Sequence, residues 1–261
     1  MPLIQLKQST LEVEQIAAPA GTARAPLVFL HEGLGSVAMW RSRDGFWPEQ
    51  VCAATGRAGV MYSRRGYGQS PGIADVRGAN RLPPDYMHHE AWQVLPELLN
   101  GLDIERPVLL GHSDGGTIAL LHAARHPLSA CVVMAPHVMV EDISITSIQA
   151  AREAYVHAHL RERLAKFHQD VDGAFWQWND VWLSEGFRSF DIRGLCRDIS
   201  APILALQGVD DAYGSLAQIE DIAPSSGRIE RHAIAQCGHS PHRDQPQHTL
   251  ALIEAFLRDK P

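Results

Sequence analysis

Short runs of apolar residues alternate along the chain with longer segments in which apolar residues recur at helical spacing. The runs lack the in-out alternation of a half-exposed strand, so they predict strands that are buried on both faces. They lie at residues 26–31, 59–63, 106–111, 130–135, 202–207 and 229–234. Two earlier segments, residues 3–7 and 11–16, are typical of a hairpin of short strands.

Helices are predicted between these strands. They are expected over most of residues 36–55 and at residues 86–101, 117–125 and 249–257. Residues 64–84 are rich in glycine, proline, aspartate and asparagine, and they predict a loop. Buried strands separated by helices predict an α/β protein with a mostly parallel sheet covered on both faces.

One segment breaks this rhythm. Residues 136–201 contain no convincing strand, and they are far longer than an ordinary crossover between strands. Apolar residues at helical spacing, such as Val171, Phe175, Trp178 and Trp182, indicate helices there. We therefore expect a core formed by residues 1–135 and 201–261, with residues 136–200 inserted as a helical cap.

The bulk composition excludes several classes of protein. The chain has 261 residues, of which 45% are hydrophobic, enough to bury the core of one domain with an insertion. The formal net charge is −7, and the longest basic run is the pair Arg64-Arg65, which argues against a nucleic-acid partner. We expect a small-molecule substrate, and the sequence carries no signal for an oligomeric state.

The cysteines and the apolar stretches indicate where the protein resides. The four cysteines are far apart and form no CxxC pair, so neither a zinc site nor a disulfide framework is expected. The first residues lack the pattern of a signal peptide, and no apolar stretch approaches the roughly 18 residues of a membrane span. These features predict a cytoplasmic protein that does not bind membranes.

Residues 108–127, VLLGHSDGGTIALLHAARHP, hold a serine between glycines at a strand-to-helix junction. A sharp turn there needs small residues on both sides, and Gly111, Gly115 and Gly116 supply them. Such a turn lifts the hydroxyl of Ser113 to the carboxyl edge of the sheet, where parallel sheets bind ligands. Ser113 is therefore the candidate nucleophile, although a serine that only caps the helix would fit the same turn.

A serine hydroxyl needs a base, and the base needs a group that orients it. His239 follows the last predicted strand, and Asp210 and Asp211 follow the strand before it, so all three lie at the edge expected for Ser113. We predict His239 as the base and Asp211 as the orienting acid, with Asp210 in reserve. His242 is a rival base that lies farther from the strand end.

Hydrolysis by serine also needs two N–H groups aimed at the oxyanion. One is expected from Asp114, the residue after the nucleophile. The other is expected from the loop HEGLGS at residues 31–36, at Gly33 or Leu34.

Five segments together resemble the α/β-hydrolase fold superfamily: FLHEGLGS, YSRRGYGQS, GHSDGG, LQGVDDAYG and CGHSPHRDQP. They occur in the family's order over nearly the whole chain. The resemblance implies an eight-stranded, mostly parallel sheet flanked by helices, with a helical cap inserted after the sixth strand. It also places Ser113, Asp211 and His239 at the positions of the catalytic triad.

The chain departs from the family pattern at two positions. Glu32 occupies a usual glycine position of the oxyanion loop, where it would form a buried ion pair or tune the site. Ser240 stands where relatives that cleave carbon–carbon bonds often carry tryptophan. Ser113 itself argues against the epoxide hydrolases and haloalkane dehalogenases of the fold, which use an aspartate nucleophile.

The expected activity is hydrolysis of carboxylic esters of small to medium apolar substrates through an acyl-enzyme. His112, Trp178 and Trp182 are the candidate pocket residues. No metal or organic cofactor is expected, because the adjacent side chains of His88 and His89 diverge on a helix. Carbon–carbon bond hydrolysis or thioester cleavage uses the same triad, and a ligand receptor on a hydrolase scaffold is the alternative outside enzymes.

Overall fold

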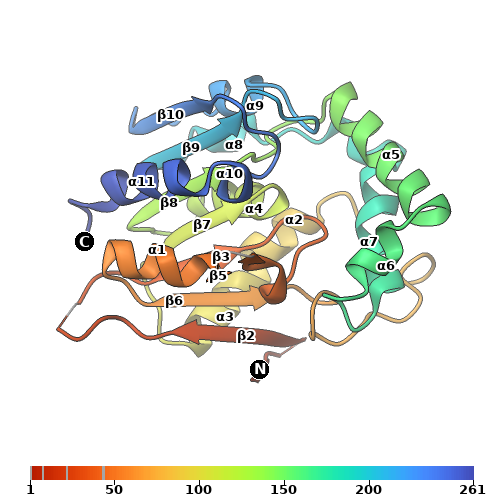
Figure 1. Ribbon diagram of the computed structural model, residues 1–261, viewed down its shortest axis with the longest axis horizontal. Helices are drawn as coiled ribbons and strands as arrows, with labels where there is room; N and C mark the ends of the chain where they lie inside the picture. The colour runs from red at the N-terminus through yellow and green to blue at the C-terminus, as the bar shows by residue number, and fades with distance from the viewer. Residues whose placement is uncertain (1, 8, 22, 43–44) are drawn as a thin grey trace.

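The computed structural model describes residues 2–7, 9–21, 23–42 and 45–261, and in these residues an eight-stranded sheet forms the centre of the molecule (Figure 1). Its strands are β1 (Leu3–Gln5), β2 (Thr10–Ile16), β3 (Leu27–Leu30), β6 (Gly59–Ser63), β7 (Val108–His112), β8 (Ala130–Met134), β9 (Ile203–Gly208) and β10 (Ile229–Ile234). Their order is β1-β2-β6-β3-β7-β8-β9-β10. The pairs β1–β2 and β2–β6 are antiparallel and the others parallel, which confirms the predicted fold class.

The central strands are buried on both faces, as their unbroken apolar runs predict. In β3, Leu27 and Phe29 pack on one side of the sheet, whereas Val28 and Leu30 pack on the other. Helices α1 (Trp47–Thr55) and α11 (Pro246–Leu257) cover the first side, in front in Figure 1. Helices α3 (Leu95–Gly101) and α4 (Asp114–Ala123) cover the second.

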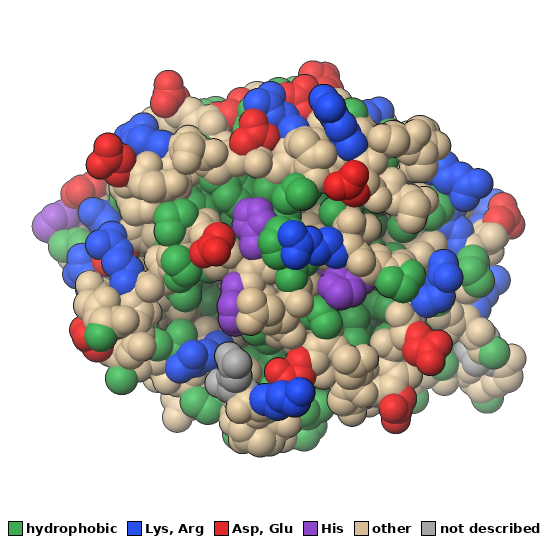
Figure 2. All heavy atoms as spheres, turned by 180° about the vertical axis from the view of Figure 1, so that it is seen from behind, with side chains coloured by type: hydrophobic (Ala, Val, Ile, Leu, Met, Phe, Trp, Pro, Cys, Tyr) green, Lys and Arg blue, Asp and Glu red, His purple; other side chains and the backbone are tan. Residues whose placement is uncertain are grey.

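Figure 2 shows the molecule from the second side. Histidine and hydrophobic side chains gather near the centre of this face, and most acidic side chains lie toward its rim. Within the described residues, no helix combines the length and hydropathy needed to cross a bilayer.

The prediction of a mostly helical segment at residues 36–55 was wrong in its first half. A 3₁₀ helix, η1 (Val37–Trp40), is followed by the strands β4 (Arg41–Ser42) and β5 (Gly45–Phe46), which pair with each other. Helix α1 begins only at Trp47, with a proline in its first turn. Proline has no N–H and its ring collides with the preceding turn, so Pro48 suits a helix start and not a helix interior.

Two other helices differ from their predicted bounds. Helix α4 begins at Asp114, three residues before the predicted start, so Gly115 and Gly116 belong to its first turn. The predicted helix at residues 86–101 divides into α2 (Tyr86–His89), a π-helical segment η2 (Glu90–Val94) and α3. Pro96 lies in the first turn of α3 and cannot donate to the carbonyl four residues earlier, which favours the wider turn before it.

Residues 136–200, which we call the inserted segment, connect β8 to the region before β9. They contain α5 (Asp142–His157), α6 (Leu160–Leu164), α7 (Val171–Trp182), the 3₁₀ helix η3 (Glu185–Ser189) and α8 (Arg193–Cys196). Figure 1 shows α5, α6 and α7 beyond the end of the sheet toward which the parallel strands point. The inserted segment therefore lies at the edge where the candidate site residues are predicted.

Candidate functional site

Ser113 occupies a strained turn between β7 and α4. Its φ of 53° lies in the left-handed region, which favours glycine and costs a serine conformational energy. A Cβ on Gly111 would collide with the backbone of Gly115, and a Cβ on Gly115 would collide with the carbonyl of Leu30. Glycine is therefore required at both positions, and the close backbone contacts hold the serine in its strained conformation.

The structure brings Ser113, His239 and Asp211 into one hydrogen-bonded chain. His239 Nε2 lies 2.9 Å from Ser113 Oγ. On the other side of the ring, His239 Nδ1 lies 2.9 and 2.8 Å from Asp211 Oδ1 and Oδ2. Ser113 is 6% exposed, so its hydroxyl and the hydrogen bond to His239 are largely shielded from water.

Strand register explains why residues so far apart in sequence meet. Strands β9 and β10 pair in parallel and end together, with Gly208 opposite Ile234. A Cβ on Gly208 would collide with the carbonyls of Cys237 and Gly238, so the loops that carry Asp211 and His239 cross in direct backbone contact.

Asp211 is fixed by more than the histidine. Its carboxylate accepts hydrogen bonds from the backbone N–H of Tyr213 at 2.7 Å and from Gln207 Nε2 at 2.6 Å. Burial tends to raise the pKa of Asp211, but the hydrogen bonds and charge of His239 lower it below its ordinary value. Asp210, the reserve candidate, is exposed to solvent.

Glu32 and His112 lie next to each other beside the hydrogen-bonded residues Ser113, His239 and Asp211. His112 Nε2 donates to the carbonyl of His239 at 2.7 Å, and His112 Nδ1 lies 3.5 Å from Glu32 Oε2. Glu32 Oε1 lies 3.5 Å from Nη2 of Arg243, a residue four positions after His239 in the sequence. Burial opposes the charge of Glu32, but His112 and Arg243 hold its pKa well below the ordinary range.

These contacts give a role for Glu32 at its unusual position in the loop, and they change the role expected for His112. Glu32 forms the partly buried ion pair that was one of the two expectations for it. His112 is 1% exposed and hydrogen-bonds the backbone of His239. It therefore supports the loop that carries His239, and its burial leaves little surface for a substrate.

The loop at residues 31–36 is held by Arg64. Arg64 Nη2 donates to the carbonyls of Glu32 at 2.9 Å and Gly33 at 3.3 Å, and the Arg64 N–H donates to His31 Nε2 at 3.0 Å. No acceptor within the described part of the chain is hydrogen-bonded to the N–H of Gly33 or Leu34. The two predicted donors of this loop therefore make no hydrogen bond to the described residues.

The side chain of Asp114 is buried in a polar cluster behind the serine. Tyr86 donates to Asp114 Oδ2 at 2.6 Å, and Trp182 Nε1 donates to the Tyr86 hydroxyl at 3.0 Å. Arg64 Nη1 lies 3.6 Å from the same carboxylate oxygen. Burial raises the pKa of Asp114, and Arg64 and Tyr86 oppose that effect.

Side chains of the inserted segment pack directly on these groups. The indole of Trp178 lies so close to Gly33 that a Cβ there would collide with it. The Trp182 ring packs against His137, whose ring centroid is 5.7 Å from that of His239. Burial lowers the pKa of His137 to about 3, so this histidine is neutral.

His137 and Tyr86 were not predicted as site residues. His137 lies three residues after the end of β8, at the same carboxyl edge as Ser113, and this position is the signal that the sequence offered. Tyr86 reaches the site from α2, which packs beside α4 on the same side of the sheet, and no local pattern marks it.

The other titratable candidates have no hydrogen bond to Ser113, His239 or Asp211 within the described residues. His242 packs against Trp40, Trp47 and His112, with ring centroids 5.1, 5.4 and 4.8 Å away, and burial holds its pKa well below the ordinary value. His88 packs against Trp92. In the described ranges, no group of three histidine, cysteine or acidic side chains is arranged to hold a metal ion.

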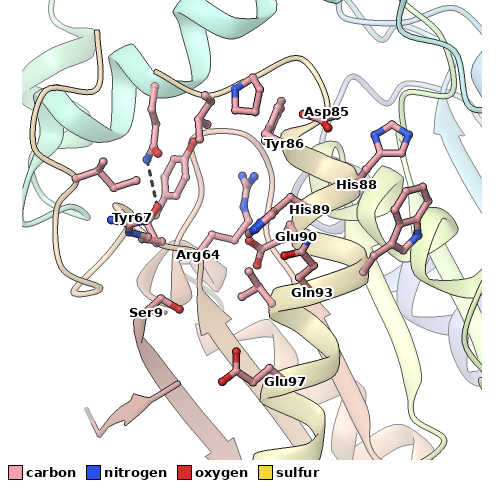
Figure 3. Close-up of a pocket in the computed structure, with 17 residues that line it drawn as sticks. Ser9, Arg64, Tyr67, Asp85, Tyr86, His88, His89, Glu90, Gln93 and Glu97 are labelled. Atoms are coloured by element: carbon pink, nitrogen blue, oxygen red, sulfur yellow. Dashed lines mark hydrogen bonds between the residues drawn. The ribbon is translucent and has the colours of Figure 1, made fainter. Parts of the chain in front are cut away.

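A cavity of about 440 Å³ adjoins the polar cluster (Figure 3). Figure 3 shows Arg64 between Tyr67 on one side and His89 and Glu90 of the neighbouring helix on the other. Tyr86 also lines this cavity, whereas Trp178, Trp182 and Ser113 do not. Arg64 and Tyr86 therefore contact Asp114 and also line this cavity, whereas Ser113 does not line it.

Comparison with known proteins places the chain among related sequences. The model of the alpha/beta hydrolase family matches residues 27–251. A diacylglycerol lipase of Danio rerio, sn-1-specific ABHD11, is 31% identical over 272 residues, which cover 89% of this chain and 78% of the lipase. The 2-succinyl-6-hydroxy-2,4-cyclohexadiene-1-carboxylate synthase of Enterobacter sp. (strain 638) is 26% identical over 259 residues, with coverage of 89% and 91%.

Solved structures share the fold. The enol-lactonase from Burkholderia xenovorans LB400 superposes with a TM-score of 0.72 and 19% sequence identity, over 99% of this chain and all of that one. The superposition supports a shared architecture, whereas a sequence identity of 19% carries no information on the substrate.

Proposed function

Because the chain belongs to the alpha/beta hydrolase family, we propose that it is a serine hydrolase that cleaves carboxylic esters through an acyl-enzyme. One observation carries the proposal. Ser113, in a strained turn, is hydrogen-bonded to His239, which is hydrogen-bonded in turn to the buried carboxylate of Asp211. This arrangement activates a serine that is otherwise a poor nucleophile.

In the proposed first half-reaction, Ser113 Oγ attacks the ester carbonyl while His239 Nε2 takes the hydroxyl proton. The N–H groups of Asp114 and of Gly33 or Leu34 bind the oxyanion. The tetrahedral intermediate then expels the alcohol, which receives the proton from His239, and the acyl group remains on Ser113. Asp211 keeps the imidazole in its productive tautomer and stabilises the imidazolium.

Water completes the cycle. His239 takes a proton from a water molecule, which attacks the acyl-enzyme carbonyl, and Ser113 leaves with that proton as the free hydroxyl. The products are a carboxylic acid and an alcohol. The proposed cycle uses no metal ion and no organic cofactor.

We assign substrate selection to the inserted segment, acting as a cap. The buried rings of Trp178 and Trp182 pack against Gly33 and His137, so this side of the site is an aromatic wall. Such a wall favours a small to medium apolar substrate over a polymer. The four cysteines are free and buried, which supports the expected reducing, cytoplasmic location.

Thioesters and the carbon–carbon bonds of ring-fission products are the alternative substrates, because the same triad cleaves them. One relative, 26% identical, bears the name of a synthase and not of an esterase, which is the reason to keep these alternative substrates in the assay. A ligand receptor on the same scaffold remains the alternative outside enzymes.

Active-site labelling tests the proposal. The protein is incubated with a short-chain p-nitrophenyl ester, with and without a fluorophosphonate, and the modified residue is located by mass spectrometry. We expect turnover and a label on Ser113. Ser113→Ala should abolish the label and lower turnover roughly 10⁵-fold, with an unchanged circular dichroism spectrum.

The other outcomes discriminate among the alternatives. A label on Ser113 without ester turnover would direct the assay to thioesters and ring-fission products. The absence of both would favour the receptor. Unchanged turnover in Ser113→Ala would remove Ser113 from the mechanism.

A further inference from the structure

The N–H groups proposed to bind the oxyanion lie on two segments that are far apart in sequence. Asp114 begins α4, and the first N–H groups of a helix have no partner within it. Gly33 and Leu34 belong to the loop that follows β3. Oxyanion binding requires both segments to keep a fixed relative position, because donors must lie within about 3 Å of one oxygen atom.

Arg64 is the side chain that bridges these two segments. Its Nη2 donates to the carbonyls of Glu32 and Gly33, and its Nη1 lies 3.6 Å from Asp114 Oδ2. Arg64 is 5% exposed, and its guanidinium lies over the ring of Tyr67, with 4.7 Å from Cζ to the ring centroid. A planar group with several fixed donors can hold two partners at once in a defined geometry.

The peptide bond converts these contacts into an orientation. In a trans peptide unit, the carbonyl and the N–H point in opposite directions. The Glu32 carbonyl shares its unit with the Gly33 N–H, and the Gly33 carbonyl shares its unit with the Leu34 N–H. Arg64 binds both carbonyls, and the Glu32 carbonyl also accepts from the Gly35 N–H at 3.0 Å and lies 2.7 Å from His31 Nδ1. Both N–H groups therefore point away from the guanidinium, and neither has an acceptor within the described residues.

We propose that Arg64 is a positioning residue that aligns the two halves of the oxyanion hole, through the Glu32 and Gly33 carbonyls on one side and the Asp114 carboxylate on the other. The inference rests on the proposed function, since it concerns the oxyanion of the same reaction. It assigns no contact between Arg64 and the substrate. Arg64 therefore affects the transition state, in which the oxyanion forms, more than it affects ground-state binding.

Arg64→Lys and Arg64→Met test this role, with Arg65→Met as the matched control. Arg65 is the exposed neighbour on the same loop, and its replacement removes the same charge. On a p-nitrophenyl ester we expect each Arg64 variant to lower kcat roughly 10²-fold with KM changed less than about threefold. Arg65→Met should leave both constants unchanged.

Inhibitor binding separates positioning from general structural damage. A trifluoromethyl ketone forms a tetrahedral oxyanion adduct with serine, whereas the matching methyl ketone resembles the ground state. Affinity for the trifluoromethyl ketone should fall in Arg64→Lys in proportion to kcat/KM, and affinity for the methyl ketone should stay within about threefold. Equal losses for both ketones, or a rise in KM at constant kcat, would overturn the proposal.

Asp114→Asn provides a second route if the Arg64 variants fail to fold. It replaces the negative charge opposite the guanidinium with a neutral amide and leaves the two carbonyl contacts, so kcat should fall about tenfold with the same selectivity between the ketones. An unchanged kcat would overturn the proposal. Fluorophosphonate labelling of Ser113 in the unaltered protein separates the two hypotheses: a labelled, active protein with normal Arg64 variants rejects only this inference, whereas an unlabelled, inactive protein rejects the proposed function as well.

Discussion

The loops at the carboxyl edge of the sheet and the inserted segment meet around Ser113, but they hold their side chains in different ways. At the sheet edge, the atoms that confine Gly111, Gly115 and Gly208 belong to the backbone of other segments: the first turn of α4, the end of β3 and the loop after β10. In the inserted segment, Trp178 and Trp182 make their contacts through side chains. Close backbone contacts tolerate almost no substitution, whereas side chains that pack on the site can be replaced by others. The same reacting groups can therefore serve different substrates.

The largest effect is expected at the acid of the edge loops. Asp211→Asn should lower kcat roughly 10⁴-fold, because an amide cannot hold His239 in the productive tautomer or stabilise its charge. Asp210→Asn is the matched control, since Asp210 is exposed and adjacent. Steady-state kinetics on a p-nitrophenyl ester measure both, and a greater loss in Asp210→Asn would transfer the role to that residue.

Glycine substitutions compare the two regions by stability. Gly115→Ala places a methyl group against the backbone at Leu30 and should lower the free energy of unfolding by about 3 kcal/mol. Gly194→Ala, in α8 of the inserted segment, meets nothing within 4 Å and should change it by less than about 1 kcal/mol.

Urea unfolding at neutral pH checks the pair of glycine variants. Similar losses in the two would mean that the edge loops are no more rigid than the inserted segment. A stable Gly115→Ala protein would show that the loop at Leu30 can move away.

Acidification should weaken both regions through their buried histidines. Burial lowers the pKa of His137 to about 3 and that of His242 well below its ordinary value. The unfolded chain therefore takes up these protons first, so stability is full above about pH 6.5 and falls as the pH decreases toward the folded-state pKa. Each histidine should contribute about 1.4 kcal/mol per pH unit in that window.

Urea unfolding between pH 7 and pH 5 measures this slope. His137→Gln, in the inserted segment, and His242→Gln, beside the edge loops, should each reduce the pH dependence of the free energy of unfolding by the contribution of one histidine. A slope that does not change in a variant would mean that its histidine is charged in the folded protein.

The smallest effect is expected from the inserted segment. Trp178→Phe shortens the ring that covers Gly33 and should raise KM about tenfold for an apolar ester, with kcat changed less than about threefold. Trp176→Phe is the control on the same helix, because the Trp176 ring lies under Arg77, with 3.9 Å from Cζ to the centroid. A loss of kcat at constant KM in Trp178→Phe would place this residue in the chemical step.

The sequence by itself determined the strands, their mostly parallel arrangement and the edge at which the functional side chains lie. Apolar runs and turn glycines are local signals, and parallel strands end at a common edge, so Ser113, Asp211 and His239 were expected there before any distance was known. The errors lay at helix starts. Gly115 and Gly116 predicted a turn, but they belong to the first turn of α4. Glycine is needed at Gly115 because the backbone of Leu30 approaches it closely.

Only the tertiary structure decided which of two adjacent aspartates faces His239. It also brought Glu32 to His112, and Arg64 to both Gly33 and Asp114. These contacts join segments that are distant in sequence, and their geometry depends on how neighbouring loops cross, which no local pattern records. Burial acts in the same way: the neutral state of His137 follows from the packing of the inserted segment over the sheet edge, and this packing exists only in the folded chain.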